Sequence, residues 1–104
     1  MTLTVRVGDD ESGKYHDVYV TVTNHDNYEM ISRLFYVCKD DRKFMLGSFE
    51  RCPTQDVDFV DIDESEVPED VKKLISQQFA EVARLLNLDP LRVYAAMTQH
   101  YDTA

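Results

Sequence analysis

The chain has 104 residues, and its 20 acidic and 11 basic residues give a formal net charge of −9. A charge of this sign and size disfavours non-specific binding to DNA, RNA and anionic membranes. Hydrophobic residues make up 43% of the chain, and only three glycines and three prolines occur, which excludes extensive disorder and predicts one domain over residues 1–104.

Alternating residues near the N-terminus predict a β-hairpin. In residues 2–7 and again in residues 15–24, aliphatic side chains alternate with polar ones, which is the pattern of half-buried strands. The polar run of residues 8–14 between them supplies the turn. Tyr19 points away from the apolar face of its strand, where it would contact a partner or pack beneath a helix or beside threonines.

The next segment supports two interpretations. A capping-box pattern followed by apolar residues at helical spacing would give a short helix over residues 27–33. However, residues 31–38 and 43–50 are rich in β-formers, so we predict a second hairpin that turns at Asp40-Asp41. Both faces of its strands are apolar, which places them centrally in a sheet with cover on each side.

The two cysteines, Cys38 and Cys52, fall near opposite ends of this second hairpin. About nine residues of strand at ~3.3 Å each separate them, which is beyond the reach of a disulfide. We therefore expect free thiols in a cytosolic or virion-interior setting, and a cytoplasmic protein. Cys38 should react slowly, because its strand is expected to be buried. No signal peptide or membrane-length apolar run is expected.

Residues 56–70 form the most acidic segment of the chain. They hold eight acids in fifteen residues, and no lysine or arginine occurs between Arg51 and Lys72. Apolar residues are interspersed among the acids, so we predict a fifth strand over residues 56–62 whose solvent face is a row of carboxylates. The apolar positions change phase, and a β-bulge near Phe59 and Val60 would bring all of them to one buried face.

Two helices are predicted after this strand. The first begins within residues 65–70, where a proline and several acids favour a helix start, and continues to about Leu86. The second begins with Asp89 as N-cap and Pro90 as first residue and ends near Tyr101. The side chains expected to be buried between the helices and the sheet include Val82, Leu85, Leu86 and Val93. The predicted fold is therefore α+β, an antiparallel sheet of about five strands, made of two hairpins plus an acidic strand, followed by two C-terminal helices packed on the sheet.

Residues 83–96 resemble the helix-turn-helix pattern. Ala83 is the small residue, Asn87 the turn residue four positions later, and Val93 the β-branched residue ten positions later. The resemblance implies a DNA-binding or regulatory module in which Arg92 would lie on the recognition helix. Over residues 64–104 acids outnumber basic residues, so we favour a structural helix corner and keep DNA binding as the alternative function.

Cofactor and catalytic motifs are weak. The run from Asp61 begins like a calcium loop, but Glu66 stands where glycine is required and Lys72 where a bidentate glutamate is required. The three histidines show no metal-ligand spacing, and neither a phosphate loop nor a nucleophile–base motif occurs. We therefore expect no metal, no cofactor and no enzymatic activity.

These observations predict a small acidic protein–protein interaction module, an inhibitor or adaptor that presents a row of carboxylates to a basic protein surface. We expect no direct contact with nucleic acid or membrane. Changing the acids at positions 58, 61, 63 and 66 to amides should leave the fold intact and weaken binding. Apolar side chains on both faces of the central strands also favour a homodimer. The acids expected in the row are Asp56, Asp58, Asp61, Asp63, Glu64 and Glu66.

Overall fold

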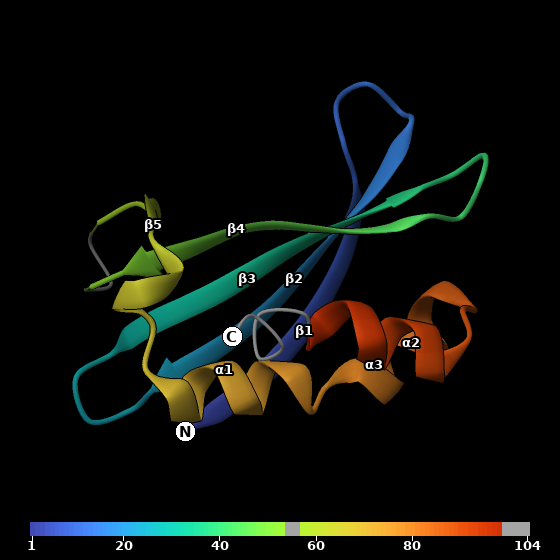
Figure 1. Ribbon diagram of the computed structural model, residues 1–104. Helices are drawn as coiled ribbons and strands as arrows, with labels where there is room; N and C mark the ends of the chain where they lie inside the picture. The colour runs from blue at the N-terminus through green and yellow to red at the C-terminus, as the bar shows by residue number, and fades with distance from the viewer. Residues whose placement is uncertain (54–56, 99–104) are drawn as a thin grey trace.

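The computed structural model describes residues 1–53 and 57–98 and confirms the predicted α+β fold (Figure 1). Its five strands form one antiparallel sheet in which each strand pairs with its neighbour in the chain. The strands are β1 (Thr2–Asp9), β2 (Tyr15–Asn24), β3 (Glu29–Cys38), β4 (Phe44–Cys52) and β5 (Val60–Ile62). They are followed by a short 3₁₀ turn, η1 (Glu64–Glu66), and the helices α1 (Glu69–Ser76), α2 (Phe79–Leu86) and α3 (Pro90–Met97).

Both predicted hairpins are present. The aliphatic residues of β1 lie opposite those of β2; Val5, for example, pairs with Val20. Their alternation with polar residues therefore puts one face of the hairpin into the core. β3 is a strand from residue 29 onward, so the alternative helix over 27–33 is wrong. A left-handed residue, Tyr28 (φ 59°), closes the turn before it, which a helix start would not allow. β3 and β4 are closed at the expected turn, where the Cys38 N–H donates to the carbonyl of Lys43 at 3.0 Å.

All three helices lie on one side of the sheet (Figure 1). α1 contacts β2, α2 contacts β1, and α3 contacts β4, so together they cover the width of the central strands. The core therefore lies between this face and the helices. Its fully buried side chains include Val18, Val20, Phe35, Val37, Ile75, Val82, Val93 and Met97. The cover expected on the second face is not supplied by any described helix, so that face of the sheet is open.

A β-bulge in β4 explains why this strand appears apolar on both faces. Two residues of β4, Gly47 and Ser48, lie opposite a single residue of β3, Leu34. The extra residue reverses the alternation, so Leu46 before the bulge and Phe49 after it both contribute to the core under the helices. The change from even to odd apolar positions in the sequence is the trace of this bulge.

The helix predicted from residue 65 to Leu86 is divided. Its expected first turn is the separate η1, α1 begins only at Glu69, and α1 and α2 are separated at Gln77 and Gln78. The Ser76 hydroxyl donates to the carbonyls of Lys72 at 2.9 Å and Met97 at 3.2 Å. It thereby ties the end of α1 to α3, and such side-chain bonds compete with regular helical bonding.

Only one of the two adjacent leucines of α2 is buried. In α2 the buried positions are Val82, Ala83 and Leu86, so the stripe that faces the sheet leaves out Leu85. Leu85 is 42% exposed and Leu86 is 6% exposed. The expectation that Leu85 is buried is therefore wrong, because the buried stripe is centred on Val82, Ala83 and Leu86 and Leu85 lies about 100° from its centre.

The corner between α2 and α3 is built as the sequence predicts. Asn87 adopts a left-handed conformation (φ 54°) that ends α2, and asparagine tolerates this region better than most residues. The Asp89 carboxylate accepts a hydrogen bond from the Leu91 N–H at 3.0 Å and caps α3. Arg42, from the β3–β4 turn, donates to the carbonyls of Leu86 and Asn87, where the helix dipole favours a cation. α3 is described to Met97, and its predicted end at Tyr101 lies outside the described residues.

Neither cysteine is part of a disulfide, and Cys52 is the more buried of the two thiols. Its thiol donates to the carbonyl of Val57 at 2.8 Å, whereas Cys38 is half-buried near the hairpin turn. The protection from reagents expected for Cys38 therefore applies to Cys52 instead.

In the native protein, a thiol reagent should modify Cys38 first and Cys52 slowly, and both thiols should react fully after denaturation. Time-resolved mass spectrometry measures this, with Cys38→Ser as the control that keeps only the slow thiol. Equal native rates would contradict the burial of Cys52.

Candidate acidic interface

The acidic segment lies at the edge of the sheet formed by β5. We call residues 57–66 the acidic edge. β5 pairs with β4 only through residues 60–62, so the strand predicted over 56–62 is shorter than expected. Residues 57–59 lie before it without strand conformation, and Asp56 lies outside the described residues.

The apolar side chains of the acidic edge are exposed. Val57, Phe59 and Val60 are 48%, 40% and 54% exposed. The predicted bulge near Phe59 and Val60 is therefore wrong, because a strand of three residues with one neighbour cannot bury all four apolar positions. Ile62 is the exception, since it lies opposite Phe49 and packs against the core.

Three of the predicted site residues form an open row of carboxylates. Asp58, Asp61 and Asp63 are all exposed. None of these three carboxylates forms an ion pair with any residue in the described part of the chain. Asp61 also lies directly opposite Glu50 of β4. Burial, reinforced by the charge of Asp61, raises the pKa of Glu50 above its ordinary value.

The other two described acids hold the segment in place. The Glu66 carboxylate accepts a hydrogen bond from the Asp63 N–H at 2.9 Å, as in a capping box around η1. Glu64 approaches the guanidinium of Arg33, with 3.9 Å between the Glu64 carboxylate and Arg33 Nη1. Glu64 and Glu66 therefore position the segment. The exposed charges without an ion-pair partner among the described residues are those at 58, 61 and 63, and the Asp63 side chain also accepts from the Glu66 N–H as the other half of the capping box.

Arg33 is the residue that sequence reasoning missed. It is buried on the helix-covered face of β3, with its guanidinium 4.1 Å from the centre of the Phe49 ring. Burial lowers the pKa of Arg33, and the charge of Glu64 opposes that shift. An arginine at an inward position between Ile31 and Phe35 was the available signal, because such a charge needs a partner from elsewhere in the fold.

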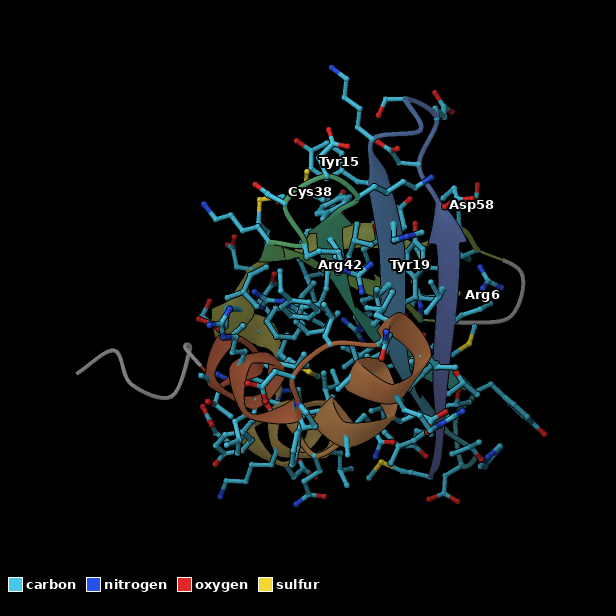
Figure 2. All side chains as sticks on the ribbon, turned by 90° about the vertical axis from the view of Figure 1, so that its right-hand side faces the viewer. Arg6, Tyr15, Tyr19, Cys38, Arg42 and Asp58 are labelled. Atoms are coloured by element: carbon cyan, nitrogen blue, oxygen red, sulfur yellow. The ribbon has the colours of Figure 1, made fainter. Side chains whose placement is uncertain are left out.

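The open face of the sheet adjoins the acidic edge. A groove of about 620 Å³ crosses it, and its lining joins Phe59 of the acidic edge to Tyr19 of β2 and Arg6 of β1. Tyr19 is not under a helix, and the Arg6 guanidinium lies 5.8 Å from its ring centre. Arg6, Tyr19 and Asp58 are labelled in Figure 2, which views the molecule along the sheet from the side of α2 and α3. The acidic edge and the open face thus share one continuous surface.

The helix pair that resembles a DNA-binding motif carries mixed charge. Arg92 lines a cleft of about 590 Å³ with Arg42 and Lys43, but Asp41 and Asp89 line it too. Arg84 is paired with Glu81 at 2.6 Å. Gln99 and His100 lie outside the described residues. The DNA-binding alternative stays a prediction.

Metal sites, membrane-spanning helices and similarity to known proteins are three further sources of functional evidence. Among residues 1–53 and 57–98, no three His, Cys, Asp or Glu side chains gather in a way that could hold a metal ion. In the same residues, every helix is too short or too polar to cross a membrane. Comparison with protein-family models, curated proteins and solved structures finds no match. The functional argument therefore rests on the geometry of this chain.

Proposed function

We propose that the protein is an interaction module, an inhibitor or adaptor, that binds a basic protein surface through the acidic edge. The observation that carries this proposal is the mixture of exposed apolar and acidic side chains in one short segment. Phe59 and its two valine neighbours offer apolar contact area, and the interleaved carboxylates offer charge. Interfaces combine these features, with an apolar centre and a polar rim.

A purely solvating acidic surface would look different. It would place its apolar residues inward, because exposing three large apolar side chains in one segment brings no benefit to an isolated domain. The acidic edge is also fixed on the sheet, since Glu64 approaches the buried Arg33 and Cys52 donates to Val57. A fixed segment loses little conformational entropy when a partner binds.

The charge of the segment determines the kind of partner. Carboxylates at positions 58, 61 and 63 without counter-charges attract a surface rich in lysine and arginine and speed its approach. Because exposed charges are screened by salt, binding should weaken as ionic strength rises.

The proposal is tested with two variants of equal net charge. The edge variant carries Asp58→Asn, Asp61→Asn and Asp63→Asn, and asparagine keeps the capping ability of residue 63. The control variant carries Glu11→Gln, Asp26→Asn and Asp40→Asn, three exposed acids in turns away from β5. Each protein is immobilised, proteins captured from cell lysate are identified, and the affinity of the captured protein is then measured at several salt concentrations.

We expect a captured protein with a basic surface whose affinity falls at least about tenfold in the edge variant and hardly changes in the control. Phe59→Ser should also weaken binding but leave the salt dependence unchanged, because it removes apolar contact only. Equal affinity of the edge variant and the control variant would contradict the proposal and leave the segment as a solvating surface.

A further inference from the structure

Three tyrosines surround one carboxylate on the open face of the sheet. Tyr15 and Tyr19 lie two residues before and after Asp17 in β2, so all three side chains are on the same face. Tyr36 of β3 lies directly opposite Asp17. On the other side Asp17 faces Gly8 of β1, which has no side chain. Burial, with the charge of Asp17 added to it, raises the pKa of Tyr19 and of Tyr36, so these rings lie near the carboxylate, and the neighbouring position in β1 carries no side chain.

The Gly8 side of this cluster is empty. A Cβ atom added at Gly8 would have no atom within 4 Å. Tyr15 and Tyr36 meet edge to face, with ring centres 6.3 Å apart and an angle of 73° between the rings. This arrangement leaves room over β1 for a side chain that enters from outside.

The Asp17 carboxylate lacks the partner that its surroundings require. Its Oδ1 atom is shielded from solvent and has no hydrogen-bond partner among the described residues. Burial raises the pKa of Asp17, and the charges of Asp10 and Asp9 raise it further. The nearby Lys39 is paired with Asp9 at 3.1 Å. A carboxylate that is partly desolvated, beside like charges and without a donor, costs stability in the isolated protein.

We propose that this cluster binds the guanidinium of an arginine side chain supplied by a basic partner protein. Guanidinium is planar, donates charge-assisted hydrogen bonds to carboxylates and stacks on aromatic rings. The protein already holds one such stacked pair, because the guanidinium of Arg6 lies over Tyr19. A lysine ammonium would satisfy the charge but would not stack on the flat faces of the rings as well.

Charge favours a basic partner over a second copy of this chain. The open face carries Glu50 and Asp61 in addition to Asp17, so two copies placed face to face would bring like charges together. The groove that contains Tyr19 also contains Phe59 of the acidic edge. A partner bound at the acidic edge would therefore have the open face within reach. This inference rests on the proposed function for the kind of partner and names the residue that the partner inserts.

The test uses N-acetyl-arginine amide as the probe. It is titrated into the ¹⁵N-labelled protein, and amide and tyrosine ring resonances are followed by NMR. Shifts that saturate are expected at Asp17, Tyr19 and Tyr36. Asp17→Asn should lower the affinity for the probe at least about tenfold, because it removes the charged acceptor. Glu11→Gln, the matched control in the neighbouring turn, should bind like the unaltered protein. N-acetyl-lysine amide should bind more weakly than the arginine probe.

Folding is checked separately. Asp17→Asn should melt at the same or a higher temperature at pH 7, because the folded protein no longer holds an ionised carboxylate whose pKa is raised. Tyr19→Leu provides a second variant that keeps the charge and removes one ring, and it too should weaken the probe. Equal probe binding by the unaltered protein and Asp17→Asn would overturn the proposal. So would a dimer in sedimentation that dissociates when Asp17 is changed.

The edge variant distinguishes the two proposals. It leaves Asp17 and the three tyrosines unchanged, so it should bind the arginine probe normally even where it has lost the partner. Loss of partner binding without loss of probe binding supports both sites. A different result would reject only the proposal that the acidic edge binds the partner. In that case the edge variant would bind the partner normally, while probe binding would still depend on Asp17.

Discussion

Leu86→Ala should lower the free energy of unfolding by about 2–5 kcal/mol, the range for a buried leucine. Leu86 lies in the core cluster with Val82 and Val93, where its loss leaves a cavity between α2 and α3. A domain of this kind is typically stable by only about 5–15 kcal/mol, so the variant should be close to unfolding at elevated temperature.

Leu85→Ala is the matched control for this prediction. Because Leu85 is largely on the outer side of α2, its replacement should cost less than about 1 kcal/mol. Urea denaturation followed by circular dichroism gives both values. Equal costs would mean that α2 is rotated about its axis so that both leucines face the core.

Gly47→Ala should also destabilise the protein, by about 1–3 kcal/mol, because it overfills the bulge in β4. A Cβ atom at Gly47 would lie 2.7 Å from the carbonyl oxygen of Leu34 and 3.0 Å from the ring of Tyr36. The first of these is a backbone atom, which can move only if β3 and β4 separate. Where space allows, replacing glycine by alanine commonly stabilises a protein by about 0.4–1 kcal/mol, because alanine lowers the conformational entropy of the unfolded chain.

Gly8→Ala is the control for that prediction, since the space around Gly8 is open and its φ is not positive. It should leave stability unchanged or slightly increased. In thermal and urea unfolding, the change in the free energy of unfolding should therefore be a clear decrease for Gly47→Ala and no change or a slight increase for Gly8→Ala. If Gly47→Ala were as stable as Gly8→Ala, the Tyr36 ring would not lie over the bulge. The Asp17 cluster would then lose one of its walls.

The strands could be predicted because their signals are local. Alternation in residues 2–7 and 15–24 reflects one covered face, and the structure covers that face with helices. Two predictions that depend on the whole fold were wrong. In the sequence the change of phase in β4 is indistinguishable from apolar character on both faces, and the bulge predicted at Phe59 and Val60 falls on exposed residues.

The candidate site was predictable only as a charged segment. The eight acids of residues 56–70 are visible in the sequence, but their roles are not. Glu64 acts through Arg33, which is 31 positions earlier in the chain and is brought near only by the packing of η1 against the sheet. Asp17 carried no signal at all, because its tyrosine neighbours come from two strands and its lack of a partner depends on their register.

The order of the strands has a consequence for how the protein acquires its structure. Each strand pairs only with the one before and after it in the chain, so every pairing closes a short loop at low entropic cost, which favours rapid folding. The helices that cover the sheet come after all five strands. During synthesis at about 5–20 residues per second, the valine-rich face of β2 therefore waits a few seconds for its cover. We therefore expect the uncovered face of the nascent sheet to be prone to aggregation until the helices have been synthesised.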